Sequence, residues 1–274
     1  MEPRSKRSTV SEKQLIHQDA WQSLREATNA RIALGRAGAS LPTQPWLDFK
    51  LAHARARDAV HIELDLAHLN KELAPMECDT VVANTAAPDR ATYLRRPDLG
   101  ARLADPSRAG LKELADKMTA KPDLSIILSD GLTAFALQEH AASLLQCLLP
   151  ILQKEDWTIA PLVIAPLARV ALQDEIGELF GARLALILLG ERPGLDSPDS
   201  LGAYLVFNPG KERTNADRNC VSNIRTAGLA PNKAADAIAY LLRQARHQGR
   251  SGITLKDDRQ VIDSYDVESL PPAE

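Results

Sequence analysis

The feature that most constrains the fold is a continuous apolar run over residues 184–189, LALILL. Because no polar residues alternate with the apolar ones, the run is typical of a β-strand covered on both faces. It ends at residues 190–194, GERPG, where two glycines and a proline predict a tight loop. Ligands bind beside the carboxyl ends of strands in open parallel sheets, so Glu191 would lie at a binding edge. The competing interpretation is an ordinary turn, since short motifs match by chance.

Apolar runs alternate with amphipathic segments from Pro122 onward. Strands are predicted at residues 124–128, 159–165, 183–189, 201–207 and 253–256. Helices are predicted up to about Gln153, over residues 172–180, and from Pro231. This alternation predicts the α/β class, with βαβ units forming a mainly parallel, Rossmann-like sheet flanked by helices.

The N-terminal part is predicted to be a helical extension. A capping box at Ser11 predicts a helix to about Arg31. A second helix begins after Thr43, and a buried stripe is predicted for its residues at helical spacing: Trp46, Phe49, His53, Ala56 and Val60. The chain thus divides into a flexible polar tail (1–20), a helical region (21–121), an α/β domain (122–258) and a loose tail (259–274).

Composition excludes several partners and sites. The 274 residues have a formal net charge of −3 and a pI of about 6.1, so no basic field is available for nucleic acid. No apolar run approaches the roughly 20 residues that a membrane span needs. Cys78, Cys147 and Cys220 are widely spaced, which argues against a structural zinc site and fits a reducing cytoplasm.

Three polar loops follow predicted strands at residues 129–131, 166–170 and 190–194, and they should share one crevice. A fourth polar segment, DRNCVSNIR at residues 217–225, could close this crevice. Its Asn side chains both donate and accept hydrogen bonds, which suits a ligand rich in amides. Alternatively, Asn219 and Asn223 satisfy turn backbone, and Cys220 is a small buried residue.

The sequence lacks the motifs of common catalysts. It has no GxGxxG fingerprint after a strand, no phosphate-binding P-loop, no GxSxG elbow and no HExxH. The histidines do not gather near Glu191, so no set of nucleophile and base can be assembled. We therefore predict no catalytic residue and no metal ligand, and a subunit that holds a cofactor while another chain does the chemistry.

An ordered set of short segments carries a more specific signal. They are RIALGRAG (31–38), LDFKLAHARARDAVH (47–61), SDGL (129–132), ARVA (168–171), DEIG (174–177), GERPG (190–194), SPDSLG (197–202), DRNC (217–220) and NIR (223–225). In this order the chain resembles the small (light) subunit of ethanolamine ammonia-lyase, from about residue 30 to Asp257. Gln173, Asp196 and Asn215 depart from the family pattern, and these departures are expected to concern loop detail.

The resemblance implies an adenosylcobalamin-dependent lyase that converts ethanolamine to acetaldehyde and ammonia, active as a hetero-oligomer with a large catalytic subunit. Cobalamin would lie between the subunits, with the small one holding its lower side and nucleotide tail. By motif, Val170, Glu191 and Cys220 are expected to contact the cofactor. A partner also implies an exposed apolar surface on the N-terminal helices. The location would be cytoplasmic or within a bacterial microcompartment.

Two other functions stay open on the sequence. A stand-alone α/β nucleotide-binding enzyme would use the same crevice and be a stable, active monomer. A non-catalytic assembly module would dock in a protein compartment through its basic N-terminal tail.

Overall fold

The computed structural model describes residues 16–259, with a strand at its centre where the sequence predicts one. Strand β4 (Leu184–Gly190) is buried along its whole length. It pairs in parallel with β2 (Leu124–Ser129) and antiparallel with β5 (Leu201–Phe207). The capping box at Ser11 lies outside the described residues, as do residues 1–15 of the predicted tail 1–20 and residues 260–274 of the predicted tail 259–274.

Six strands form one sheet in the order β1-β3-β2-β4-β5-β6, with β1 at Thr80–Val82, β3 at Leu162–Ile164 and β6 at Arg218–Ile224. The strands from β1 to β4 are parallel, whereas β5 and β6 are antiparallel to their neighbours. The α/β class is therefore confirmed, but the prediction of a mainly parallel sheet is wrong. The reason is the short links at residues 191–200 and 208–217, because a parallel pair needs a crossover of about a dozen residues or more.

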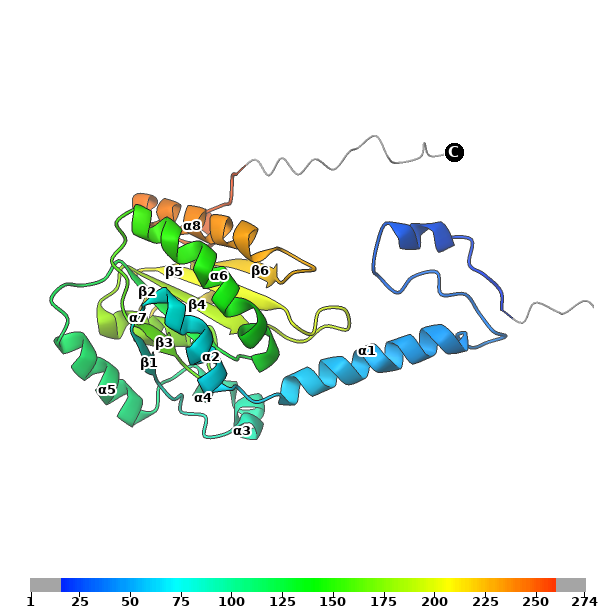
Figure 1. Cartoon of the computed structure of the whole chain (residues 1–274), viewed down its shortest axis with the longest axis horizontal. Helices are drawn as coiled ribbons and strands as arrows, with labels where there is room; N and C mark the ends of the chain where they lie inside the picture. Colours follow the sequence, from blue (N-terminus) through cyan, green and yellow to red (C-terminus); the bar gives the residue numbers. More distant parts are fainter. Residues whose placement is uncertain (1–15, 260–274) are drawn as a thin grey trace, which may run out of the picture.

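Helices cover both faces of the sheet (Figure 1). Their bounds are α1 (Thr43–His61), α2 (Leu66–Leu73), α3 (Arg90–Arg95), α4 (Pro97–Gly100), α5 (Asp105–Asp116), α6 (Ala134–Lys154), α7 (Leu172–Phe180) and α8 (Pro231–Gln248). Within the described range, α6 alone is long and apolar enough to cross a bilayer, but it packs against the sheet and α8 as a core helix.

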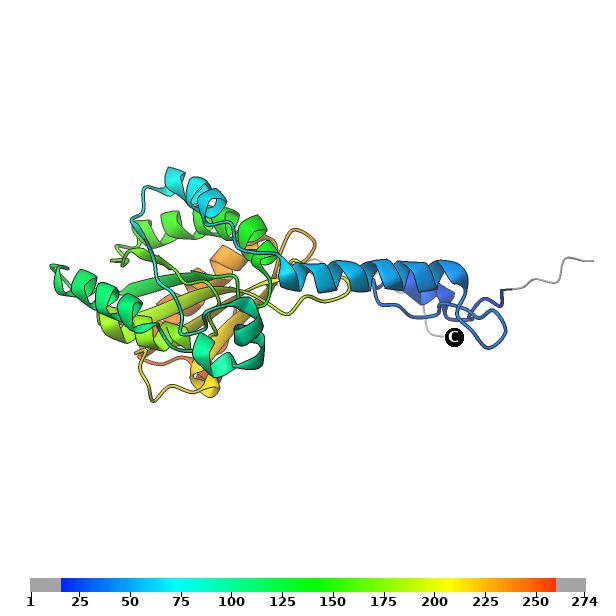
Figure 2. The ribbon, with the colours of Figure 1, turned by 90° about the horizontal axis from the view of Figure 1, so that it is seen from below.

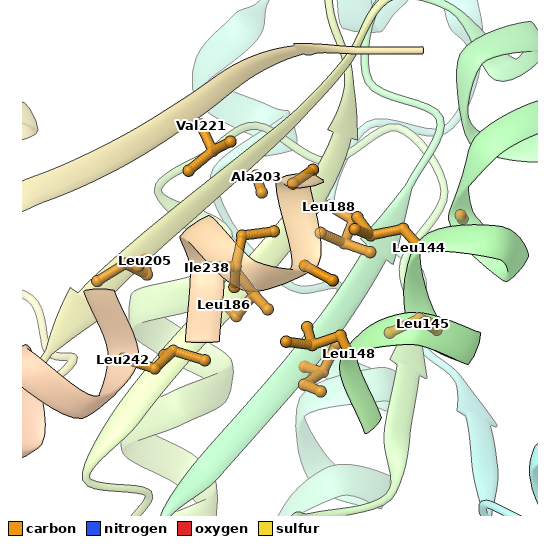
Figure 3. Close-up of a cluster of buried hydrophobic side chains, with 14 of the residues drawn as sticks. Leu144, Leu145, Leu148, Leu186, Leu188, Ala203, Leu205, Val221, Ile238 and Leu242 are labelled. Atoms are coloured by element: carbon orange, nitrogen blue, oxygen red, sulfur yellow. The ribbon is translucent and has the colours of Figure 1, made fainter. Parts of the chain in front are cut away.

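The apolar run of β4 supplies two cores. Its alternate residues Leu184, Leu186 and Leu188 belong to the core under α6 and α8, part of which appears in Figure 3. The residues between them, including Ala185 and Ile187, belong to the second core under α5 and α7. Successive strand residues point to opposite faces, so a strand covered on both sides must be apolar throughout.

Four segments differ from the sequence-based expectations. The described part of the helix predicted to run to Arg31 contains only a short 3-10 helix, Gln22–Glu26. The predicted last strand at 253–256 is replaced by the 3-10 helix Gly252–Thr254. Strand β1 comes from the region predicted to be helical, and the polar segment 217–225 contains strand β6. β6 has only one covered face, so it lacks the apolar run on which the prediction relied.

The N-terminal arm, residues 16–61, extends away from the rest of the molecule along α1 (Figure 2). The predicted buried stripe of α1 is wrong. Trp46 is 46% exposed and His53 is exposed, while Phe49, Ala56 and Val60 are only half-buried. The buried residues of α1 are Ala52 and Ala59. The expected exposed apolar surface is present on this arm.

The two-core arrangement gives a stability prediction. Leu186 is fully buried, so Leu186→Ala should leave a cavity and lower the free energy of unfolding by about 2–5 kcal/mol. Leu94→Ala is the matched control, because Leu94 is 38% exposed and should cost far less. Urea unfolding followed by circular dichroism measures both. Equal losses in the two variants would contradict the assignment of β4 to the core.

Candidate functional site

The three loops predicted to share one edge of the sheet do meet there. The Leu167 N–H donates to Asp130 Oδ1 at 2.6 Å, and the Ala168 N–H donates to Ser129 Oγ at 3.0 Å. The Leu132 N–H donates to the Gly190 carbonyl at 2.9 Å. These bonds join the ends of β2, β3 and β4 into one framework.

A buried ion pair holds this framework together. The Asp130 side chain is 5% exposed, and the Arg90 guanidinium donates to it at 3.0 Å. Burial raises the pKa of Asp130, while the bond from Leu167 and the charge of Arg90 lower it. Arg90 also donates to the carbonyls of Gly131 at 2.6 Å and Val60 at 3.0 Å, and so ties the end of α1 to the loops. Arg90 was missed from sequence because its short helix carries no apolar periodicity.

Gly190 of the GERPG segment and Gly202 of the SLG segment lie so close to neighbouring atoms that a side chain would not fit. A Cβ on Gly190 would lie 2.0 Å from the Thr133 carbonyl oxygen, so no other residue fits there. A Cβ on Gly202 would lie 2.7 Å from Glu191 Oε1. Gly202 therefore allows the Glu191 carboxylate to lie against strand β5.

The Glu191 carboxylate collects donors from two strands. It accepts hydrogen bonds from Ser200 Oγ at 2.5 Å, Ser222 Oγ at 2.6 Å, the Asn223 N–H at 3.2 Å and the Tyr204 hydroxyl at 3.4 Å. A carboxylate has about four acceptor sites, so these bonds nearly fill them. Glu191 thus fixes the β4–β5 loop to β6 and orients the hydroxyls around it.

Cys220 lies beside the same group. It is the register partner of Tyr204 in the β5–β6 pair, so the two side chains are neighbours. Partial burial raises the pKa of the Cys220 thiol, and the nearby Glu191 carboxylate raises it further, whereas hydrogen bonding with Tyr204 lowers it. Burial also raises the pKa of Tyr204. Both groups therefore stay neutral at physiological pH, and Cys220 is exposed rather than the small buried residue of the alternative interpretation.

Val170 lies just before helix α7 and packs against the same core as Tyr204. It is half-buried at the edge of the second core, two residues before α7 begins. Asp174 of α7 pairs with Arg218 of β6, and both side chains are nearly buried. This ion pair joins the segment that carries Val170 to the strand that carries Cys220. Glu191 and Cys220 thus lie beside the same Tyr204 side chain, whereas Val170 is joined to them only through α7 and the Asp174–Arg218 pair.

Gln173 corrects one expectation. It lies fully buried in α7 rather than in a loop. The main-chain oxygens of Tyr204 and Ala185 face this amide, and its nitrogen donates to them at 2.9 Å and 3.2 Å once the amide group is turned to match those acceptors. It therefore holds α7 against strands β4 and β5, and its departure from the family pattern concerns packing.

We call the surface formed by Glu191, Tyr204, Cys220 and Ser222 the cradle. On β6, Cys220 and Ser222 are exposed, whereas Val221 and Ile224 are buried on the opposite face with α8. The cradle offers hydroxyls and a neutral thiol. Within residues 16–259, no three His, Cys, Asp or Glu side chains gather in a way that could hold a metal ion.

The buried ion pair can be tested by substitution. Asp130→Asn should lower the free energy of unfolding by about 3–5 kcal/mol, because the partly buried Arg90 guanidinium loses the counter-charge of the buried Asp130 carboxylate. Asp98→Asn is the control, since the Asp98–Arg96 pair is exposed and should contribute nothing measurable. Chemical denaturation compares the variants. An Asp130→Asn protein as stable as the control would rule out this role.

The thiol environment predicts a pH profile. Alkylation of Cys220 by iodoacetamide should be slow at pH 7 and rise about tenfold per pH unit towards its raised pKa, because only the thiolate reacts. Peptide mass spectrometry follows the reaction, and Cys220→Ser identifies the modified peptide. Rapid modification at pH 7 would mean that the pKa is lowered, contrary to the environment described above.

Comparisons with known proteins identify the family of the chain. The family model of the ethanolamine ammonia-lyase light chain matches residues 18–256. The ethanolamine ammonia-lyase small subunit of Azotobacter vinelandii is 48% identical over 252 residues, which cover 92% of this chain and 93% of the relative. The Pseudomonas fluorescens small subunit (strain SBW25) is 46% identical over 241 residues, covering 88% and 87%. The chain therefore belongs to the family of ethanolamine ammonia-lyase small subunits.

Proposed function

We propose that this chain holds adenosylcobalamin against a larger catalytic subunit, in a lyase that converts ethanolamine to acetaldehyde and ammonia. Family membership supports the lyase activity, and the relatives' name, small subunit, implies a larger partner. The observation that carries the cofactor role is the network around Glu191, which builds a rigid polar surface and leaves one face of it open.

The chemistry of the cradle fits a cobalamin. That cofactor presents a rim of amide groups, ribose hydroxyls and a phosphate, and so needs both acceptors and donors. Ser222 donates its proton to Glu191, so its oxygen keeps lone pairs for an amide N–H from outside. The exposed position of Ser222 and Cys220 leaves room for a large flat group.

The three residues expected to contact the cofactor would act in different ways. Val170 would offer backbone groups and apolar surface at the start of α7. Glu191 would act chiefly by fixing Ser222 and Tyr204, since its own acceptor sites are occupied by the chain's donors. Cys220 would pack against the cofactor as a neutral thiol, because its raised pKa disfavours the thiolate that binds metals.

The side chains of the cradle indicate which steps each subunit would perform. When bound, the cofactor supplies a cobalt–carbon bond whose homolysis provides the radical for hydrogen abstraction. The cradle residues would orient it and exclude water from one side. None of them forms a nucleophile–base pair, so the groups that bind and convert ethanolamine are assigned to the large subunit.

The test uses the complex reconstituted with the large subunit. Glu191→Ala should weaken cobalamin binding tenfold or more and leave ethanolamine binding nearly unchanged, because Ser222 and Tyr204 lose their common acceptor. Glu178→Ala is the matched control, since Glu178 is exposed on α7. Equilibrium dialysis with hydroxocobalamin measures the affinity.

A second measurement does not depend on activity. In the wild-type complex, saturating hydroxocobalamin should slow the alkylation of Cys220 at pH 9. Unchanged cobalamin affinity in Glu191→Ala, together with an unprotected Cys220, would remove the cradle from the cofactor site.

A further inference from the structure

The loop between β4 and β5, residues 191–200, is held against helix α6 by a buried histidine. His140 Nε2 lies 3.1 Å from Asp199 Oδ2, and the two side chains are 8% and 23% exposed. An ionised carboxylate only accepts hydrogen bonds, so the His140 ring donates through Nε2. Because α6 is the long core helix that packs on the sheet, His140 gives the loop a rigid anchor.

An arginine binds the other oxygen of the same carboxylate. Arg225, which follows β6, donates to Asp199 Oδ1 at 3.4 Å, and its side chain is 15% exposed. Its Nε also donates to Asn223 Oδ1 at 2.9 Å. Asp199 therefore joins three parts of the fold, namely α6, the β4–β5 loop and the end of β6.

These contacts continue to the Glu191 carboxylate. Ser200, next to Asp199 in the sequence, donates to Glu191 Oε2 at 2.5 Å. The Asn223 N–H donates to the same oxygen at 3.2 Å. Side chains and backbone thus form a closed ring that runs from Glu191 through Asp199 and Arg225 and returns to Glu191. A network of satisfied polar groups makes the segments that it joins rigid.

Asn223 needs this support because of its backbone conformation. Its φ is +58°, in the left-handed region that asparagine enters more readily than most residues but still at a cost in energy. A Cβ on Gly228 would lie 2.5 Å from the Asn223 carbonyl oxygen, so the turn after β6 is tightly packed. The bond from Arg225 to the Asn223 side chain stabilises the conformation in which the Asn223 N–H points at Glu191.

We propose that His140 and Asp199 are positioning residues for the cradle. They hold the β4–β5 loop and the end of β6 in place, so that Glu191 keeps the donors Ser222 and Tyr204. Neither His140 nor Asp199 belongs to the cradle, so their effect on a bound cofactor is indirect. This inference rests on the proposed function, which gives the cradle its role in holding cobalamin.

The test replaces His140 in the full-length chain. His140→Leu removes the hydrogen bond, whereas His140→Gln keeps an N–H donor for Asp199. In the complex reconstituted with the large subunit, His140→Leu should raise the Kd for hydroxocobalamin about fivefold, the change expected when one hydrogen bond of ordinary net strength is lost. His140→Gln should bind within about twofold of wild type. Glu139→Gln is the control, because Glu139 is exposed beside His140 on α6.

A second readout needs neither the large subunit nor the cofactor. The Glu191 carboxylate helps to raise the pKa of the Cys220 thiol. When Glu191 is no longer fixed, the pH midpoint for alkylation of Cys220 by iodoacetamide should fall. It should therefore be lower in His140→Leu and return to the wild-type value in His140→Gln. Circular dichroism shows whether each variant is folded.

Each outcome decides between the possibilities. An unchanged alkylation midpoint in His140→Leu overturns the proposal, and so does a His140→Gln protein that is as impaired as His140→Leu. If His140→Leu does not fold, Asp199→Asn takes its place, because it removes the charge that both donors bind and should give the same shift. If the alkylation midpoint falls but cobalamin affinity stays at the wild-type value, the positioning role stands and the proposed cofactor role of the cradle fails.

Discussion

The structure of the site depends on one carboxylate at the point where β4 ends and the antiparallel half of the sheet begins. Glu191 accepts hydrogen bonds from β5, from β6 and from the loop between β4 and β5. Charge-assisted bonds of this kind are the stronger ones in proteins, and several on one group fix its neighbours. Without them, the hydroxyls of Ser222 and Tyr204 would have no common orientation.

Sheet topology then decides where a ligand can lie. The α6 and α8 side of the sheet is a continuous core that extends from β2 to β6. On the other side, α7 belongs to the core with β2 and β4, and β6 presents Cys220 and Ser222 to the exterior. The antiparallel return of β5 and β6 therefore creates an open polar face beside the ends of the parallel strands. Buried Asp130 and its ion-pair partner Arg90 keep the neighbouring loops in place.

Elements with a local sequence signal lie where that signal predicts them. The run at 184–189 and the strand at 201–207 are found within a residue, because burial on both faces leaves an uninterrupted apolar pattern. The three loops at the sheet edge also meet as predicted. The sequence did not predict strand β6 or the role of Arg90, because both depend on partners more than thirty residues away along the chain. Ser222 of β6 bonds to Glu191, and Arg90 bonds to Asp130.

The exposed arm shows why amphipathic spacing alone is ambiguous. Trp46, Phe49 and His53 recur at helical spacing, and an intramolecular core was expected to cover them. The same pattern suits a face that another chain covers, and one sequence does not contain that chain. The ion pair of Arg31 with Asp196, which links this arm to the cradle loop, is likewise invisible without coordinates.

The most direct test of the central claim is a structure of the small and large subunits assembled with cobalamin. We expect the corrin or its nucleotide tail to lie over the exposed face of β5 and β6, in contact with Cys220 and Ser222. A cofactor that lies on the α6–α8 side, or that is enclosed by the large subunit without touching this chain, would contradict it.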